Sequence, residues 1–240
     1  MKIELWADIV CPYCGLMDNR LRLALDRFEH ADDVQVIHRS IQLHPDLPRE
    51  GVTQRRLFQM AGMPTATGEK LLTSIEATAH AEGLSPYHAL ERTLGPTDHA
   101  HELLAHATAQ GRGNEVWTAM FRAHFGQARK LWTLDEVLDF AEEVGLDRGE
   151  AAQALRERRY RAQVEADQRE AERLGARGAP FLVIDGAYAV PGALDTDRLL
   201  AAMTRAWRES HPAPRPLPVI ADAEGLCGPD GCAVPQRPAR

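Results

Sequence analysis

The sequence predicts an α/β protein in which a β-α-β half and an α-β-β-α half are separated by a large α-helical insertion. Three observations support this fold class. Apolar residues alternate over about 3–8 and are followed by an amphipathic helical pattern. Between 47 and 159 the apolar residues recur at helical spacing, and no period-two alternation is found. Two short apolar runs then flank Asp185-Gly186, a dipeptide typical of a two-residue β-hairpin.

The first half begins with a strand and a helix that meet at a Cys-Pro-Tyr-Cys motif. The alternating residues of the strand are Ile3, Leu5, Ala7 and Ile9. The helix has one apolar stripe, formed by Met17, Leu21, Ala24, Leu25 and Phe28. A second short strand is predicted at Val34, Val36 and His38.

The insertion contains the clearest helix signal of the chain. Thr133-Leu134-Asp135-Glu136 is a capping box, and Gly145 is a typical residue just past a helix end. A further apolar stripe at i, i+4 and i+8 is more typical of a packed core than of a cofactor site; it consists of Trp117, Phe121 and Phe125.

The second half is predicted to contain a helix over about 160–174, ended by Gly175, and strands at 181–184 and 187–190. A final helix follows, with apolar residues at core spacing: Leu199, Leu200, Met203 and Trp207. From Pro212 onward the composition is proline-rich and no apolar period is visible, so this segment is a tail and not a domain.

Length, charge and cysteine content exclude several functional classes. A chain of 240 residues can bury a core without disulfides, and its net charge of -7 argues against a nucleic-acid surface. No stretch approaches the roughly 20 apolar residues that a membrane-spanning helix needs, and the N-terminus has no signal-peptide pattern. We therefore predict a cytoplasmic protein that binds neither nucleic acid nor membrane, and in that reducing compartment a thiol pair is more typical of catalysis than of structure.

Cys11-Pro12-Tyr13-Cys14 is the motif that carries chemistry. Cys11 is expected at the helix N-cap and Pro12 at the first helical position, so that the sulfur faces unpaired backbone N–H groups. These donors and the helix dipole favour the thiolate, which is the form that attacks disulfides. Cys14 lies on the same helix face and can close a disulfide with Cys11. Half of a zinc site is the alternative interpretation, but we favour redox chemistry and expect no metal.

Four motifs together resemble a known family, the DsbA-like branch of the thioredoxin superfamily, and more closely its cytosolic FrnE-type members. The motifs are Asp8-x-x-Cys11-Pro12-Tyr13-Cys14, Ala100-His101, Glu172-x-x-Gly175 and Gly178-Ala179-Pro180-Phe181-Leu182-Val183-Ile184. The resemblance covers essentially the whole chain. The sequence departs from it at Tyr13, where Trp or Phe is usual, and at Pro96, where Asn is common.

The resemblance implies a thioredoxin-like fold and a peptide bond between Ala179 and Pro180 that is cis and faces the dithiol. The thioredoxin-like domain would be discontinuous, with the helical insertion as a second domain and a tail carrying a C-x4-C pair. The expected ranges are 1–46 with 160–210, 47–159, and 211–240. Tyr13, Ala179 and Pro180 are the expected substrate-binding residues, with a substrate peptide adding as a strand.

Two further residues are candidate modulators of the dithiol. For Asp8 we favour acceptance of backbone hydrogen bonds at the end of the strand over a role in proton transfer. For His101, which shares its helical window with two other histidines, we favour a surface or hydrogen-bonded core position over proton transfer or glutathione contact.

Cys227 and Cys232 flank Gly-Pro-Asp-Gly, which is turn chemistry compatible with a disulfide. A local disulfide, a pair of metal ligands and a second redox pair that exchanges with Cys11 and Cys14 all remain open. An extended tail of 17 residues between Ser210 and Cys227 would span about 50 Å, against a compact radius of gyration of about 18 Å.

These observations predict a protein thiol–disulfide oxidoreductase, acting as reductase or isomerase, in which Cys11 attacks and Cys14 resolves. Its partners would be disulfide-containing proteins or peptides and a thiol reductant system. No bound cofactor is expected, glutathione is a candidate co-substrate, and monomer and homodimer both remain open. The first alternative is a glutathione-dependent isomerase or transferase similar to hydroxychromene-carboxylate isomerase or kappa-class glutathione transferase, which typically carry Ser or a lone thiol at the first position. The second is a redox-switched holdase or adaptor.

Overall fold

The computed structural model describes residues 1–212, and its secondary-structure elements follow the predicted order. The first half consists of β1 (Lys2–Ala7), α1 (Pro12–Leu25) and β2 (Gln35–Ser40). The second half consists of α8 (Arg161–Arg173), β5 (Phe181–Ile184), β6 (Tyr188–Pro191) and α9 (Thr196–Ser210). The predicted α/β fold with a helical insertion between these halves is confirmed.

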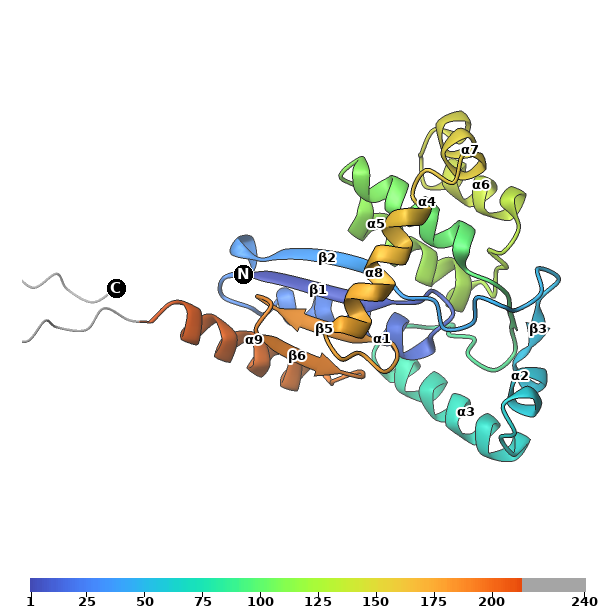
Figure 1. The fold of residues 1–240 in the computed structure, drawn as a ribbon. Coiled ribbons are helices and arrows are strands. Elements are labelled where there is room, and N and C mark those ends of the chain that lie inside the picture. The colour runs from blue at the N-terminus through green and yellow to red at the C-terminus, as the bar shows by residue number, and fades with distance from the viewer. Residues whose placement is uncertain (213–240) are drawn as a thin grey trace, which may run out of the picture.

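One four-stranded sheet joins the two halves in the order β2-β1-β5-β6 (Figure 1). β1 is parallel to β2 and antiparallel to β5, with Trp6 opposite Phe181 and Leu5 opposite Leu182. Because β1 and β5 are neighbours, the loop that follows β1 and the loop that precedes β5 meet at one end of the sheet. That end carries the dithiol.

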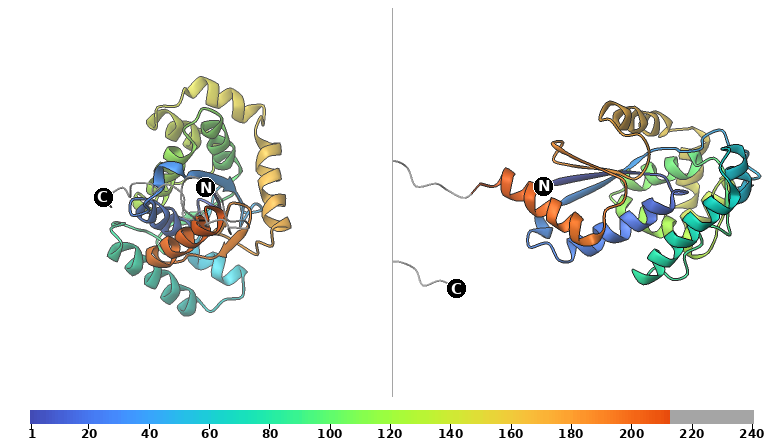
Figure 2. Two further views of the ribbon diagram at one scale, coloured as in Figure 1. Left: turned by 90° about the vertical axis from the view of Figure 1, so that its left-hand side faces the viewer. Right: turned by 90° about the horizontal axis from the view of Figure 1, so that it is seen from below.

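Helices cover both faces of the sheet (Figure 2). Leu5 and Leu182 point into the larger core on the side of α1 and α9. Trp6 and Phe181 point to the opposite face, where they pack against Ala171 of α8. The indole Nε1 of Trp6 also donates a hydrogen bond to Asp167 O of α8, 2.9 Å away. This alternation places apolar side chains of β1 on both faces of the sheet.

The insertion is mostly helical, as predicted, and extends beyond the dithiol end of the sheet (Figure 1). Its helices are α2 (Gln54–Met60), α3 (Thr65–Ala81), α4 (Asp98–Ala109), α5 (Gly113–Phe121), the π-helix η2 (Arg122–Gly126), α6 (Leu134–Glu143) and α7 (Arg148–Arg156). It also contains two short strands that were not predicted, β3 (Val52–Thr53) and β4 (Thr93–Leu94), which pair antiparallel. Two-residue strands are too short to show a period-two pattern in the sequence.

Two local predictions agree with the backbone. Thr133 and Glu136 form the capping box of α6, and Gly145 follows that helix with a φ of 76°. Asp185 and Gly186 have φ values of 51° and 66°, as expected for the turn between β5 and β6. The predicted aromatic stripe is buried, although Phe125 lies in η2 and not in an α-helix.

Hydrogen bonds, in addition to apolar packing, attach the insertion to the sheet. His38 of β2 places Nε2 2.9 Å from Asp18 Oδ1 of α1 and Nδ1 2.9 Å from Asn114 Oδ1 of α5. Asn114 Nδ2 also donates to Val36 O of β2. None of the helices within residues 1–212 is long and apolar enough to cross a membrane. The division of the chain into domains at the boundaries given above stays a prediction.

Candidate active site

Cys11 and Cys14 lie at the start of α1, immediately after the end of β1. Cys11 is the N-cap residue with extended backbone angles, and Pro12 occupies the first helical position. The N–H of Cys14 donates to Cys11 O at 2.9 Å, which places the two residues in one turn. Both side chains are free thiols and both are buried, with exposed fractions of 5% for Cys11 and 0% for Cys14.

The sulfur of Cys11 makes no hydrogen bond to the free N–H groups of α1, which the sequence led us to expect it to face. The N-cap side chain makes no capping hydrogen bond. Instead, Cys11 Sγ lies 3.4 Å from Ala179 O and donates to it. The bond between Ala179 and Pro180 is cis, as the family resemblance implies. In this arrangement the sulfur lies against the loop that precedes β5, where Ala179 is half-buried and Pro180 is buried.

Cys14 lies deeper than Cys11 and is harder to ionise. Burial raises the pKa of the Cys14 thiol well above its usual range, and the neighbouring Cys11 and the negative charge of Asp8 raise it further. A thiol in such a site stays protonated at neutral pH. Cys14 therefore needs a base before it can act as a nucleophile.

Asp8 and His101 form a fully buried polar pair behind the dithiol. Asp8 accepts hydrogen bonds from the backbone N–H of Leu43 at 2.7 Å and of Val10 at 3.4 Å, while His101 Nε2 lies 3.3 Å from Asp8 Oδ1. Burial alone would raise the pKa of Asp8, but the interaction with His101 and the two N–H donors lower it. The other ring nitrogen of His101, Nδ1, is buried without a hydrogen-bond partner. His101 is thus a core residue whose hydrogen bonding is only half satisfied.

Two residues of the insertion, Tyr87 and Arg92, contact the dithiol loop, and neither was predicted from the sequence. Tyr87 Oη donates to Pro12 O at 2.5 Å, and Arg92 Nη2 donates to Val10 O at 2.8 Å. His124 Nε2 lies 2.5 Å from Arg92 Nη1. A single tyrosine, arginine or histidine among helical residues forms no motif, so the sequence carried no signal for these contacts.

A half-buried histidine in the loop after β2 was also missed. Burial and the positive charge of Arg92 lower the pKa of His44, while the charge of Asp8 opposes them. His44 is therefore within electrostatic range of both buried groups. Like the residues of the insertion, it forms no motif in the sequence.

Tyr13, Cys227 and Cys232 are the remaining predicted site residues. Tyr13 is 39% exposed, at the dithiol end of α1. Cys227 and Cys232 lie outside the described residues. Among residues 1–212, no three His, Cys, Asp or Glu side chains are grouped so that they could hold a metal ion.

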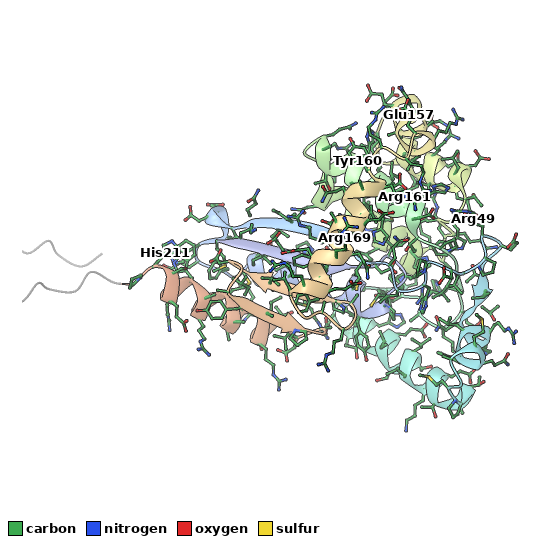
Figure 3. The ribbon with its side chains drawn as sticks, viewed as in Figure 1. Arg49, Glu157, Tyr160, Arg161, Arg169 and His211 are labelled. Atoms are coloured by element: carbon green, nitrogen blue, oxygen red, sulfur yellow. The ribbon has the colours of Figure 1, made fainter. Side chains whose placement is uncertain are left out.

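A second cluster of charges lines a cavity of about 350 Å³ between the loop after β2 and helices α4 and α8. Asp98 accepts hydrogen bonds from both Arg49 and Arg158, while Glu102 lies 2.9 Å from Arg158. Two residues that line this cavity are labelled in Figure 3: Arg49, in the loop after β2, and Arg161, at the start of α8. The dithiol does not line this cavity.

The sequence matches the DSBA-like thioredoxin domain over residues 2–204. The chain belongs to this family. DsbA-like oxidoreductases act on disulfide-containing substrates, and the chain is a thiol–disulfide oxidoreductase, which confirms the enzyme class predicted from the sequence. The FrnE-type subgroup stays a prediction.

The solved structures that resemble this member of the DSBA-like family include the following three. A probable DsbA oxidoreductase from Streptomyces coelicolor is 38% identical, with a TM-score of 0.81, and the match covers 98% of this chain and 100% of that one. A 2-hydroxychromene-2-carboxylate isomerase is 15% identical, with a TM-score of 0.66 over 90% and 100% of the two chains. The cytosolic disulfide reductase DsbM from Pseudomonas aeruginosa, solved with GSH, is 20% identical, with a TM-score of 0.55 over 88% and 98%. The last two similarities show the fold alone.

Proposed function

We propose that the protein reduces or isomerises disulfides of protein and peptide substrates through Cys11 and Cys14. The observation that carries this proposal is the 3.4 Å contact between Cys11 Sγ and Ala179 O. A sulfur held against the backbone next to Pro180 lies beside the loop that precedes β5, and we propose that an extended peptide pairs with the backbone of this loop. A substrate disulfide bound there would lie beside the attacking sulfur.

The reaction consists of two exchange steps. The Cys11 thiolate attacks one sulfur of the substrate disulfide, so that a mixed disulfide forms and the other substrate sulfur leaves as a thiolate that takes up a proton. Cys14 then loses its proton and attacks Cys11 Sγ, which releases the second substrate thiol. The substrate gains two electrons, and the enzyme is left with a disulfide between Cys11 and Cys14.

Asp8 is the proposed proton acceptor for Cys14. It is buried like Cys14, and its charge acts on the Cys14 thiol. Because it already accepts two backbone hydrogen bonds, it is held in place while it exchanges a proton directly or through water. His101 Nε2, 3.3 Å from Asp8 Oδ1, keeps the carboxylate deprotonated between turnovers and therefore able to take up the proton, although the same contact lowers its basicity.

A thiol reductant must return the enzyme to the dithiol form. Two molecules of glutathione would reduce the disulfide of the enzyme and become glutathione disulfide, which balances both electrons and protons. The pair Cys227 and Cys232 is a second candidate donor, because two thiols of the tail could reduce the same disulfide by becoming one themselves. A cytoplasmic location, with a reduced glutathione pool, would favour the reductive direction.

The proposal is tested by insulin-disulfide reduction with glutathione as the electron source. Wild type should be active, Cys11→Ser should lose activity, and Cys14→Ser should accumulate a mixed disulfide with insulin at Cys11. The double variant Cys227→Ser/Cys232→Ser is the matched control: retention of activity would assign reduction to glutathione, whereas loss would assign a relay to the tail. Full activity of Cys11→Ser would overturn the proposal.

The apolar surface of the insertion favours the holdase as a second candidate function. Apart from Tyr13, the large apolar side chains that are exposed within residues 1–212 all lie on α2, α3 and the turn between them; they are Met60, Met63 and Leu71. Exposed methionines adapt to irregular apolar peptides. A variant with all four cysteines replaced by serine should suppress aggregation of a denatured client as well as wild type does, and Met60→Gln/Leu71→Gln should suppress it less.

The glutathione-dependent isomerase has weaker support. Its solved counterpart shares only the fold, and this chain carries both thiols of the motif.

A further inference from the structure

Arg92 is a buried cation whose hydrogen-bond partners are all neutral. It is 6% exposed, and it donates from Nε to Ala89 O at 3.0 Å and from Nη2 to Val10 O at 2.8 Å. Its third partner is the imidazole of His124. No ion pair of the described residues includes Arg92, although an unpaired buried charge is costly. Burial lowers the pKa of Arg92 to about 10, so the guanidinium remains charged at neutral pH.

His124 fixes the orientation of this guanidinium as a neutral acceptor. Its Nδ1 donates to Arg129 O at 2.9 Å, which leaves Nε2 unprotonated and able to accept from Arg92 Nη1. Burial and the positive charge of Arg92 lower the pKa of His124 to about 3. The ring of Phe125, 4.8 Å from Arg92 Cζ, covers the planar face of the guanidinium. The π-helix η2 thus supplies two of the groups that hold Arg92.

These contacts place the charge of Arg92 at the dithiol. Val10, whose carbonyl it binds, directly precedes Cys11, and Tyr87 from the same segment binds the carbonyl of Pro12 on the other side. Cys11 and Asp8 both act electrostatically on Arg92. The insertion therefore contacts the backbone on both sides of the attacking sulfur.

The carboxylates around Arg92 already have hydrogen-bond partners, so Cys11 is the acidic group that is left to pair with its charge. Glu76 Oε1 accepts from the N–H groups of Ala89 and Leu90. Asp8 accepts from Leu43 and Val10 and contacts His101. The remaining titratable groups near this position are Tyr87, Cys14, His44 and His124, which burial keeps in their neutral forms.

We infer that Arg92 is a positioning residue whose guanidinium supplies the counter-charge for the thiolate formed at Cys11. The inference rests on the proposed function and deepens it, because it assigns to the helical insertion the electrostatic control of the dithiol. When Cys11 loses its proton, the unpaired buried cation gains an anion next to it. Stabilisation of that thiolate also stabilises the reduced enzyme, and this makes its disulfide more oxidising.

The test uses full-length protein with Cys14, Cys227 and Cys232 replaced by serine, so that Cys11 is the single thiol. The midpoint pH of its alkylation by iodoacetamide is compared in three forms: unchanged Arg92, Arg92→Gln, which keeps an N–H donor but removes the charge, and Arg92→Lys, which keeps the charge. We expect Arg92→Gln to raise the midpoint by at least one pH unit and Arg92→Lys to restore most of the difference. Arg20→Met is the control, because Arg20 is a buried arginine paired with Glu82; it should leave the midpoint unchanged.

Equilibration of the otherwise wild-type Arg92→Gln enzyme with glutathione and glutathione disulfide gives a second readout. The equilibrium should shift at least tenfold toward the enzyme disulfide, which corresponds to a potential more negative by about 30 mV. A folded Arg92→Gln protein with an unchanged midpoint and an unchanged potential would overturn the inference. Insulin reduction by wild type is independent of this outcome, so loss of the inference would leave the proposed function standing.

If Arg92→Gln does not fold, wild type and Cys11→Ser provide the test. The reduced wild type should gain stability relative to Cys11→Ser as the pH rises through the midpoint of Cys11 alkylation, because only wild type then pairs Arg92 with an anion. A stability difference that does not change over this pH range would also overturn the inference.

Discussion

Tyr87 Oη and Pro12 O are 2.5 Å apart, so a tyrosine of the insertion binds the first turn of the dithiol helix. The phenol ring stacks on Phe125 at a centroid distance of 4.6 Å. Gly15 leaves the room for this arrangement, because a Cβ at that position would lie 2.5 Å from Tyr87 Oη and 3.1 Å from Phe125 Cδ2. The packing between α1 and the insertion thus depends on a residue without a side chain.

Gly15→Ala is expected to destabilise the protein even though alanine is the better helix former. The gain in helix propensity is about 1 kcal/mol, whereas overpacking of a core typically costs about 1–3 kcal/mol. Urea unfolding should show the net loss, and Tyr87→Phe should recover part of it by removing the hydroxyl. Gly178→Ala, where a Cβ meets no atom within 4 Å, serves as the control. A Gly15→Ala protein as stable as wild type would contradict this packing.

Removal of the charge of Asp8 should destabilise the fold and uncouple His101. Loss of one member of a buried pair typically costs about 3–5 kcal/mol, so Asp8→Asn should lower the free energy of unfolding by an amount in this range. In a double-mutant cycle with His101→Gln, we expect a coupling energy of about 1–3 kcal/mol. Additive effects of the two substitutions would show that the 3.3 Å contact contributes nothing.

The buried Cys14 thiol should make the reduced protein sensitive to alkali. Because its pKa is raised in the folded state, the group favours folding below its unfolded pKa and loses this contribution as the pH rises toward the folded value. The free energy of unfolding of the reduced wild type should therefore fall between neutral and alkaline pH more steeply than that of Cys14→Ala. Identical pH profiles of the two proteins would contradict the assignment.

Asp98 should contribute stability that is lost in acid. Burial raises its pKa, but the hydrogen bonds from Arg49 and Arg158 outweigh this and lower it from 3.8 to about 2. A lowered pKa stabilises the folded state above the unfolded value, and the contribution disappears as the pH falls through the folded value. The stability difference between wild type and Asp98→Asn should therefore shrink between pH 3.8 and about 2. Asp197→Asn, which removes a highly exposed partner of Arg27, should show no such difference.

The regular elements of the fold could be predicted because their signals are local. Alternation in β1, the capping box at Thr133 and the Asp185-Gly186 turn each lie within a few residues of sequence. The strands β3 and β4 could not be predicted, since two residues carry no period and their pairing joins Val52 to Leu94 across the insertion. Tertiary contacts, and not local preference, form that small sheet.

The dithiol could be located from its motif, but its surroundings could not. The proximity of Cys11 to Ala179 could be expected from the family resemblance alone, and the sulfur bonds Ala179 O and none of the helix N–H groups. Arg92 and His124 escaped prediction because nothing in a linear pattern indicates which buried polar side chains meet. A capped helix can be identified from four residues, whereas an electrostatic environment requires the folded chain.

The separation of Cys11 and Ala179 along the sequence has a consequence for biosynthesis. The contact between Cys11 and Ala179 joins residues 168 positions apart, so a ribosome would have to make most of the chain before the two could meet. Until then the nascent polypeptide carries a pair of thiols without the backbone that restrains them. Contacts of such long sequence separation form slowly, and the reactive centre would therefore mature among the last parts of the molecule.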